Sequence, residues 1–418
     1  MRVTKAEQDP AGDFGLIADA DRIRLYSRLL IAAYVVTIGA LFVMSRGLVD
    51  PAGRPFGYDF ITFWTAGDLT LHGNPAGAFD PTTIVAAQQQ IAPGNSAIYL
   101  WHYPPTYQLI AAGLALLPYL PSLALFTLVG IAAYGLVLRQ LVPWREATVI
   151  LLALPGAFTA VIHGQNSLIS AALICAALLT LDRRPIVSGA MIGLLAYKPQ
   201  LAALFPLVLA ATGRWRTFVS AGITALAFAA LATVVLGIDL WATFIGNAKV
   251  LRTVLEDGQL PWAKMPTAFV TVAMLGGPKW LAYTAQALVA LTAAIVTVAV
   301  WRRCGTSPLA GGTLVVGTLL LPPYTYDYEL AMLAIPLAAL ARDMILRGAG
   351  TGGKIMLLIV ILTPAVMSAI AAVTGIQVGF FVLAATFAWC AGRALRSTQA
   401  NRADPYDWLP GRMFAALN

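Results

Sequence analysis

Asp59 is the first residue whose type and position point to chemistry, because it is an isolated acid within a long aromatic segment. An aspartate at the start of a helix often serves as an N-cap. A carboxylate held at a membrane surface can equally take a proton from a hydroxyl group as a general base. The sequence leaves both interpretations open. Asp68, nine residues later, lies half a turn out of phase on a helix, so the two acids do not predict a paired-carboxylate site.

Lys198 is the most unusual charge in the chain, because it lies between two apolar runs of about 12 residues. A hairpin that short places its tip at or below the membrane surface, where a lysine is costly unless it snorkels or meets an anion. One interpretation is therefore a side chain that snorkels to lipid headgroups. The other is a compact positive charge that binds a lipid phosphate.

Further polar side chains lie in short turns between apolar runs, where helix capping and binding of a sugar or phosphate are both possible roles. The candidate binding residues are His102, Tyr103, His163, Gln165, Asn166, Gln200, Tyr326, Asp327 and Glu329. The three histidines of the chain share no metal-ligand spacing, so we expect no metal site and no cofactor. We also find no phosphate-binding glycine loop and no Rossmann fingerprint.

The composition identifies the kind of protein that carries these residues. Of 418 residues, 59% are hydrophobic and only 11% are charged, whereas a soluble domain is about 25% charged. The chain is therefore predicted to be an all-α polytopic membrane protein; a soluble globular enzyme is not expected, and a disordered chain is excluded. The net charge of +8 is expected to reflect basic cytoplasmic loops, not a nucleic-acid partner. The 3 cysteines form no CxxC pair and predict no disulfide framework.

The apolar runs predict about twelve transmembrane crossings (10–13), several of them short or broken. Breaks are expected at Pro118 with Pro121 and at 276–278. We expect a cytoplasmic segment 1–28, a single transmembrane domain 29–395 and a cytoplasmic tail 396–418. The first outer loop, 46–105, is predicted to carry interfacial helices.

One interfacial helix is expected just after Asp59, where Phe60, Phe63, Trp64 and Gly67 recur at helical spacing. Such a stripe predicts an aromatic face that lies among the lipid headgroups.

Orientation follows from the basic residues beside the apolar runs, which the positive-inside rule places in the cytoplasm. They are Arg22, Arg24, Arg28, Arg139, Arg145, Arg183, Arg184, Arg214, Arg216, Arg302, Arg303, Arg342, Arg347, Arg393 and Arg396. One alternation of crossings satisfies all of them and puts both termini inside. The polar clusters then all fall on the outer face, which predicts chemistry or binding there.

At these positions the chain resembles the polyprenol-phosphate-dependent mannosyltransferases of glycosyltransferase family 87, in the GT-C superfamily. The resemblance is carried by an ordered series: Asp59-Phe60, Phe63-Trp64, Ala66, Gly73-Asn74-Pro75, Phe79-Asp80, Tyr103-Pro104-Pro105, Gly164-Gln165-Asn166, Gly189, Gly193, Lys198-Pro199, Pro323 and Tyr326-Asp327. This series runs from about residue 57 to 340.

The resemblance implies a GT-C-type fold and an integral-membrane hexosyltransferase with a polyprenyl-phosphate-linked sugar donor. Mannose is the first expectation for the transferred hexose. A lipid or glycan hydroxyl would be the acceptor, with inversion at the sugar. By the same resemblance Asp59 would be the general base and Lys198 would bind the donor phosphate. Membrane lipids are the expected surroundings, in a bacterial plasma (inner) membrane with the site facing the periplasm or cell exterior.

Two other classes of function stay open. A transporter or flippase of a lipid-linked or small polar substrate should also carry polar residues in mid-membrane and on the cytoplasmic half. The intramembrane runs here are nearly free of acids and amides, which favours the enzyme. A non-catalytic assembly partner with the same fold is the third possibility.

Overall fold

The computed structural model describes residues 20–142, 147–348 and 350–400, and in these residues the chain is helical, with isolated β-bridges and no strand. Arg145, residues 1–19 of the predicted N-terminal segment and residues 401–418 of the predicted tail lie outside the described residues. The all-α prediction is confirmed for the described chain.

Among the described residues, six helices are long and apolar enough to cross a membrane, by length and composition. They are α1 (Ala20–Met44), α5 (Tyr119–Leu138), α11 (Trp215–Leu236), α14 (Lys279–Cys304), α17 (Thr351–Thr374) and α18 (Val378–Ala400). Helix α1 begins ahead of the predicted start of the first span at residue 29, and α18 continues past residue 395. The count of about twelve crossings stays a prediction.

Shorter helices fill the space between these six. The apolar ones are α8 (Ser167–Thr180), α9 (Pro185–Leu194) with η4 (Leu195–Tyr197), η5 (Pro199–Ala202) with α10 (Leu204–Ala211), and α15 (Pro308–Leu320). The others in the bundle are η3 (Arg139–Leu141), α6 (Ala147–Leu152), α7 (Pro155–Ile162), η7 (Asp327–Leu333) and α16 (Ala334–Arg347). Prolines begin α7, α9, η5 and α15, where a missing N–H costs no helical hydrogen bond.

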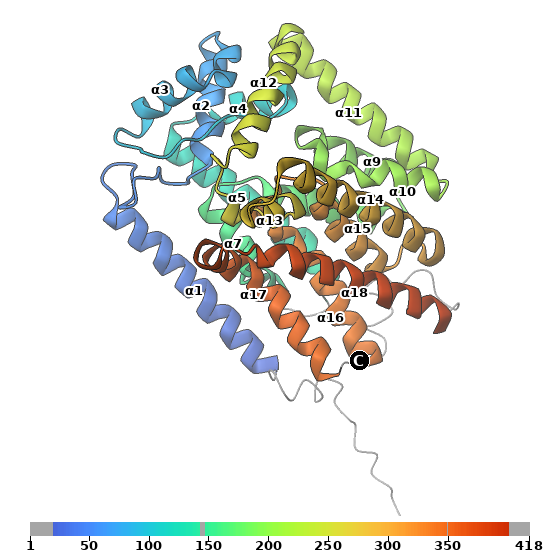
Figure 1. Cartoon of the computed structure of the whole chain (residues 1–418). Helices are drawn as coiled ribbons and strands as arrows, with labels where there is room; N and C mark the ends of the chain where they lie inside the picture. Colours follow the sequence, from blue (N-terminus) through green and yellow to red (C-terminus); the bar gives the residue numbers. More distant parts are fainter. Residues whose placement is uncertain (1–19, 143–146, 349, 401–418) are drawn as a thin grey trace, which may run out of the picture.

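The remaining helices gather mostly at one end of the molecule (Figure 1). They are α2 (Phe60–Leu71), η2 (Pro75–Phe79), α3 (Pro81–Ile91), α4 (Pro105–Leu114), α12 (Asp239–Glu256), η6 (Trp262–Lys264) and α13 (Ala268–Met274). We call the part formed by α2, α3, α4 and α12 the cavity end. The predicted breaks are confirmed, because α4 and α5 are separate around Pro118, and α13 and α14 are separate around 275–278.

The opposite end of the molecule carries basic residues. The first turns of α1 and α17 and the last turn of α16 lie together there, far from α2, α3 and α12 (Figure 1). These turns contain Arg22, Arg24, Arg347 and Lys354. These ends of α1, α16 and α17 thus lie away from the cavity end.

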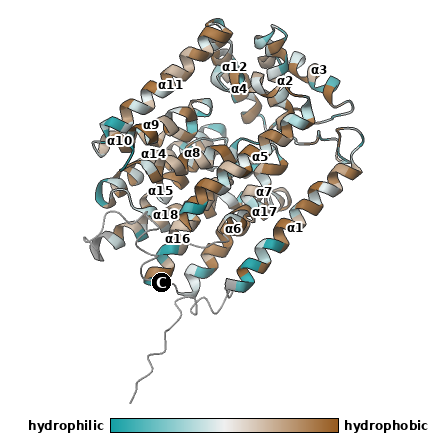
Figure 2. Cartoon of the chain, turned by 180° about the vertical axis from the view of Figure 1, so that it is seen from behind, coloured by the Kyte–Doolittle hydropathy of each residue, from teal (hydrophilic) through white to brown (hydrophobic). Residues whose placement is uncertain are grey.

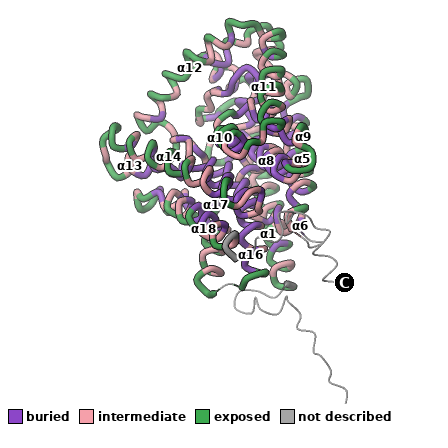
Figure 3. Tube along the Cα trace, turned by 90° about the vertical axis from the view of Figure 1, so that its right-hand side faces the viewer, coloured by how far each residue is buried: buried purple, intermediate pink, exposed green. Residues whose placement is uncertain are grey.

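Apolar side chains cover the outside of the bundle as well as its core. Helices α1 and α11 lie on opposite sides and are hydrophobic along most of their length (Figure 2). Only 6% of the most apolar window in each is buried, and Val43 of α1 is 82% exposed. Buried residues lie inside and exposed ones outside (Figure 3). An exposed apolar surface of this extent needs a bilayer as its solvent.

Close helix packing explains the glycines that precede Lys198. Helix α9 lies along α11, and Gly189 and Gly193 face it. A Cβ atom on Gly189 would lie 2.5 Å from the Thr217 carbonyl oxygen, and one on Gly193 would lie 2.6 Å from the Ala221 carbonyl oxygen. Small residues four apart allow this approach of two membrane helices. The contact fixes α9, and with it the position at which Lys198 follows.

The aromatic stripe of α2 does not lie among headgroups. Phe60 and Phe63 are fully buried, and their rings pack against aromatic side chains such as Tyr107 of α4 and Phe126 of α5. The prediction of an aromatic face in the headgroup region is therefore wrong for these two residues. Aromatic side chains of α4 and α5 cover the stripe, so it forms part of a buried core.

Candidate active site

A cavity of about 660 Å³ opens at the cavity end, well within the volume range of small-molecule sites. Most of the predicted site residues line it: Asp59, His102, Tyr103, His163, Gln165, Lys198, Gln200, Tyr326 and Glu329. They come from segments up to 270 positions apart in the chain. They converge on one cavity, which is therefore the candidate active site.

Two predicted residues lie outside this lining. Asn166 is buried behind it, where its Oδ1 accepts a hydrogen bond from Lys198 Nζ at 3.2 Å. Asp327 is also buried, and its carboxylate accepts hydrogen bonds from the Tyr328 backbone N–H at 2.9 Å and from the Ser368 hydroxyl at 3.3 Å. Both residues are placed to support the site from behind.

Asp59 occupies the N-cap position of α2, yet its side chain makes no capping hydrogen bond. Its Oδ2 atom instead accepts a hydrogen bond from Gln165 Nε2 at 3.0 Å and lies 3.5 Å from His163 Nδ1. Within the described part of the chain, no hydrogen bond reaches the other oxygen, Oδ1. The side chain is 19% exposed. Asp59 therefore presents one unoccupied carboxylate oxygen beside the cavity, which a capping role would not require.

The surroundings of Asp59 keep its carboxylate ionised. Burial alone would raise the pKa, but the contact with His163, the hydrogen bond from Gln165 and the positive charge of Lys264 outweigh it. The net effect is a pKa below the ordinary aspartate value. Asp59 is thus charged at neutral pH and ready to accept a proton.

The residue before Asp59 holds a strained backbone conformation. Tyr58 has a φ of 40°, which is rare for a residue with a side chain. Its hydroxyl donates to Asp50 Oδ2 at 3.3 Å, the Arg54 guanidinium lies over its ring, and its edge meets the ring of His163. Several contacts thus hold the turn that aims Asp59. Strain retained in this way is typical of functional sites.

The turn between α7 and α8 presents His163 and Gln165 to Asp59, and Gly164 makes this turn possible. Its φ is 57°, and an added Cβ atom would lie 2.6 Å from Phe60 Cβ and 2.7 Å from the Gly57 carbonyl oxygen. Only a glycine fits this close contact with the start of α2.

We therefore expect Gly164→Ala to destabilise the protein and to reduce its activity. The left-handed backbone costs about 1–2 kcal/mol and the collision with α2 adds about 1–3 kcal/mol. Thermal unfolding in detergent measures the first effect. Gly222→Ala is the matched control, because a Cβ atom at Gly222 of α11 meets nothing within 4 Å. Equal unfolding temperatures for the two variants would contradict this account of the turn.

Lys198 forms a buried ion pair with Glu329, with Nζ and Oε1 2.8 Å apart and both side chains 4% exposed. It also donates to Asn166, and its ammonium lies 5.6 Å from the Tyr103 ring and 5.3 Å from the Tyr328 ring. Snorkelling to headgroups does not describe this side chain. The pairing was not expected from the sequence, because the partners are 131 positions apart.

Aromatic rings form a further part of the cavity lining. Tyr326 and Tyr328 are stacked with ring centroids 5.1 Å apart, and Tyr328 lies against His163. Tyr103 donates a hydrogen bond to Gln165 Oε1 at 3.3 Å, which leaves the amide nitrogen of Gln165 facing Asp59. Ring faces beside hydrogen-bonding groups suit a carbohydrate, which offers both C–H faces and hydroxyls.

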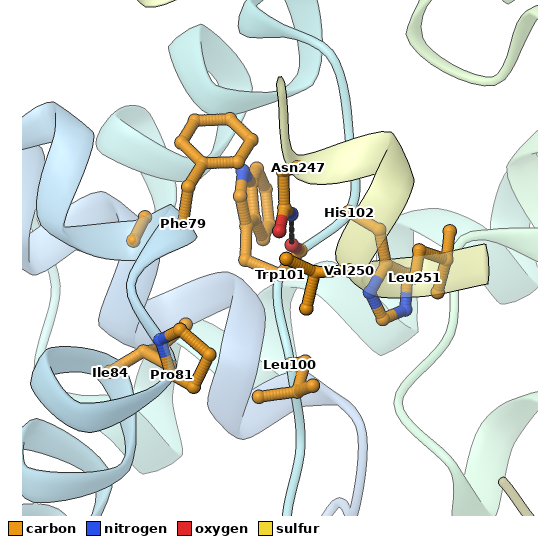
Figure 4. Close-up of a pocket in the computed structure, with 10 residues that line it drawn as sticks. Phe79, Pro81, Ile84, Leu100, Trp101, His102, Asn247, Val250 and Leu251 are labelled. Atoms are coloured by element: carbon orange, nitrogen blue, oxygen red, sulfur yellow. Dashed lines mark hydrogen bonds between the residues drawn. The ribbon is translucent and has the colours of Figure 1, made fainter. Parts of the chain in front are cut away.

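His102 is uncharged at neutral pH, because burial lowers its pKa to about 4. It lines both the main cavity and a small one of about 10 Å³ beneath α12. In this small cavity Asn247 of α12 points to the backbone of Trp101 and donates a hydrogen bond to its carbonyl at 3.0 Å (Figure 4). A neutral His102 can orient a polar ligand group without adding charge.

Sequence reasoning missed the wall that α12 supplies and the lysine that follows it. Phe244, Asn247, Leu251 and Val254 line the cavity from one face of α12, with helical spacing. Lys264, in η6, lines it too, and its Nζ lies 3.3 Å from His163 Nε2. Helical periodicity in 239–256 could have revealed the wall, whereas nothing in the sequence links Lys264 to His163.

Candidate metal ligands are not clustered. Among residues 20–142, 147–348 and 350–400, no group of three or more His, Cys, Asp or Glu is arranged to hold a metal ion. The polar lining consists mainly of single acids, lysines, amides and tyrosines.

The sequence profile of glycosyltransferase family 87 matches residues 101–323, which is more than half of the chain. The match covers His102, Tyr103, His163, Gln165, Lys198 and Lys264, while Asp59 and Glu329 lie outside it. No curated protein and no solved structure matches the chain. With its apolar helices and this profile over most of the cavity lining, the chain belongs to glycosyltransferase family 87 and is a membrane glycosyltransferase that fits the GT-C superfamily.

Proposed function

We propose that this glycosyltransferase moves a hexose, in the first place mannose, from a polyprenyl-phosphate-linked donor to a hydroxyl of a lipid or glycan acceptor. The observation that carries the proposal is the ionised Asp59 carboxylate, with Oδ1 unoccupied, beside a cavity of about 660 Å³. A cavity of this volume suits a sugar and the groups joined to it. Surrounding apolar helices suit a lipid-linked substrate.

The proposed reaction is a single displacement with inversion. The acceptor oxygen attacks the anomeric carbon, and the bond from that carbon to the phosphate oxygen breaks. Asp59 takes the acceptor proton, and polyprenyl phosphate leaves with the electron pair. A base that is ionised at working pH can contribute about 10²–10⁴-fold to such a step.

Lys198 is proposed to stabilise the leaving phosphate, although its charge is shared with Glu329. An ammonium has three N–H donors, and Lys198 uses two of them on Glu329 and Asn166. The third can donate to a phosphate oxygen in the cavity that Lys198 lines. The pair then acts as a fixed dipole whose positive end faces the developing charge.

The sugar and acceptor are proposed to be held by the remaining lining residues. Tyr103, Tyr326 and Gln200 offer hydroxyl and amide groups, and neutral His102 can donate or accept. Asn166 and Asp327 act from behind through their hydrogen bonds to Lys198 and Tyr328.

The proposed location is a bacterial inner membrane, with both termini inside and the cavity facing the periplasm or cell exterior. The support is the separation of the basic helix ends from the cavity end (Figure 1). The positive-inside rule assigns those basic ends to the cytoplasm.

We expect the purified protein to transfer sugar from a polyprenyl-phosphate-linked hexose and not from a nucleotide sugar. The test incubates the protein with each radiolabelled donor and a lipid extract, and measures labelled product by chromatography. Product from the nucleotide sugar alone would contradict the proposed donor. Mass spectrometry of cell-envelope lipids and glycans from a deletion strain would then identify the sugar and acceptor.

A transporter or flippase is the alternative. In sealed proteoliposomes it would move an intact lipid-linked sugar across the bilayer without cleaving the sugar–phosphate bond. Cleavage coupled to a new glycoside separates the two functions.

A further inference from the structure

Lys264 and His163 form a chain of contacts that ends at Asp59. Lys264 Nζ lies 3.3 Å from His163 Nε2, and His163 Nδ1 lies 3.5 Å from Asp59 Oδ2. The three residues come from η6, from the turn after α7 and from the start of α2. Nothing in the sequence brings them together, and all three line the cavity.

The chemistry of the ammonium group decides the tautomer of His163. A lysine ammonium has only donors, so its contact with Nε2 requires that nitrogen to be the acceptor. The ring proton of a neutral His163 is then on Nδ1, the nitrogen that faces Asp59. This nitrogen is buried and has no hydrogen-bond partner within the described part of the chain, and Asp59 Oδ2 lies 3.5 Å from it.

The same contacts explain which oxygen of Asp59 is left for chemistry. Gln165 and His163 both approach Oδ2. The orientation of Gln165 is in turn fixed, because its Oε1 accepts from Tyr103 and from the Asn166 backbone N–H, each at 3.3 Å. Oδ1 faces no donor in the described residues, so a hydroxyl in the cavity can reach it.

Lys264 also differs from the other cations of the cavity. Arg54 is paired with Asp50, and Lys198 is paired with Glu329. Within residues 20–142, 147–348 and 350–400, no ion pair joins Lys264 to a carboxylate. Its positive charge lies beside His163 and acts on the Asp59 carboxylate.

We infer that Lys264 is a positioning residue for the general base: it holds His163 in the Nδ1–H tautomer, so that His163 and Gln165 together occupy Oδ2 and leave Oδ1 of Asp59 to receive the acceptor proton. His163 is then also a positioning residue and not a sugar ligand. This inference rests on the proposed function, in which Asp59 is the base. It adds no step to the reaction, because the proton still passes from the acceptor hydroxyl to Asp59.

The test replaces Lys264 by methionine and follows kcat/KM against pH. The variant loses the positive charge of Lys264 and the contact that fixes the tautomer of His163. Both losses make ionisation of Asp59 harder, so the pKa of Asp59 rises. Activity that depends on ionised Asp59 is lost as pH falls through that pKa. The acidic limb, which is the low-pH side of the kcat/KM profile, should therefore move to higher pH by about 0.5–1 unit. The variant should therefore be slower than the wild type only at acidic pH near that pKa and should match it at neutral pH, while the KM for the lipid-linked donor should stay unchanged.

Other titratable groups that interact with Asp59 are the same in both proteins. They are His102, Asp327, Tyr99, Tyr103, Tyr119, Tyr326 and Tyr328. Lys264→Arg keeps the charge and the donors, so it should keep the wild-type limb. Lys249→Met is the matched control, because Lys249 is an exposed lysine of α12 that does not line the cavity.

Two outcomes would overturn the inference. A raised KM for the lipid-linked donor with an unmoved acidic limb would mean that Lys264 binds the donor phosphate directly. An unchanged profile and unchanged KM would mean that Lys264 has no role in positioning. In either case measurable transfer by the wild-type protein leaves the proposed function standing, whereas absence of transfer in the wild type would remove that function itself.

Discussion

Replacing Asp59 by asparagine should reduce the rate of sugar transfer by about 10²–10⁴-fold, the contribution of a well-placed general base. The amide has nearly the shape of the carboxylate, and its oxygen can still accept from Gln165. It cannot take up the acceptor proton, however. We therefore expect normal folding and normal binding of the lipid-linked donor. Initial rates with purified protein measure the loss, and donor titrations measure the binding.

Asp68→Asn is the matched control for this variant. Asp68 lies on the same helix, beside His72, and does not line the cavity. We expect it to keep wild-type activity. If Asp59→Asn kept full activity in a well-folded protein, another group would have to accept the proton, and the proposed role of Asp59 would fail.

Replacing Lys198 by alanine should destabilise the protein strongly, by about 3–5 kcal/mol, because Glu329 is left as a buried charge without its partner. One oxygen of Glu329, Oε2, already has no hydrogen-bond partner among the described residues. Thermal unfolding in detergent measures the loss. Lys279→Ala removes a lysine that is 56% exposed and paired with Glu256 and Asp257, so it should leave the unfolding temperature unchanged.

The double variant Lys198→Met with Glu329→Gln separates stability from catalysis. It removes both charges of the pair, so most of the lost stability should return. If Lys198 stabilises the leaving phosphate, this stable protein should still use the lipid-linked donor poorly. Wild-type donor kinetics in the double variant would mean that the ion pair only supports the fold.

The scarcity of charged residues was the useful guide to which side chains line the cavity. Only 11% of the residues are charged, so an acid or a lysine between apolar runs is a candidate functional residue. Asp59 and Lys198 were predicted in this way, and both line the cavity. The breaks before α5 and α14 were also readable, because proline and glycine cannot continue a helix cheaply. The features that local composition determines were thus accessible.

Features that depend on distant contacts were not accessible. Whether Asp59 caps α2 or acts in the cavity depends on Gln165 and His163, more than 100 positions away. The partner of Lys198 lies in η7, and the lysine beside His163 lies in η6. Hydropathy carries no information on which turns of a membrane bundle meet.

The aromatic stripe of α2 illustrates the same limit. Phe60 and Phe63 have the spacing of an interfacial helix, and that pattern is identical whether lipid or protein covers the helix. Tyr107 and Phe126 decide the outcome, because they cover the stripe from α4 and α5.

One measurement tests the central claim most directly. Purified protein is incubated with a polyprenyl-phosphate-linked hexose and a lipid acceptor extract, and mass spectrometry follows both products in wild type and in Asp59→Asn. We expect the wild type to release polyprenyl phosphate and to form an equal amount of new glycoside, and the variant to form neither at a comparable rate. Intact donor without a new glycoside, or equal product from both proteins, would contradict the account.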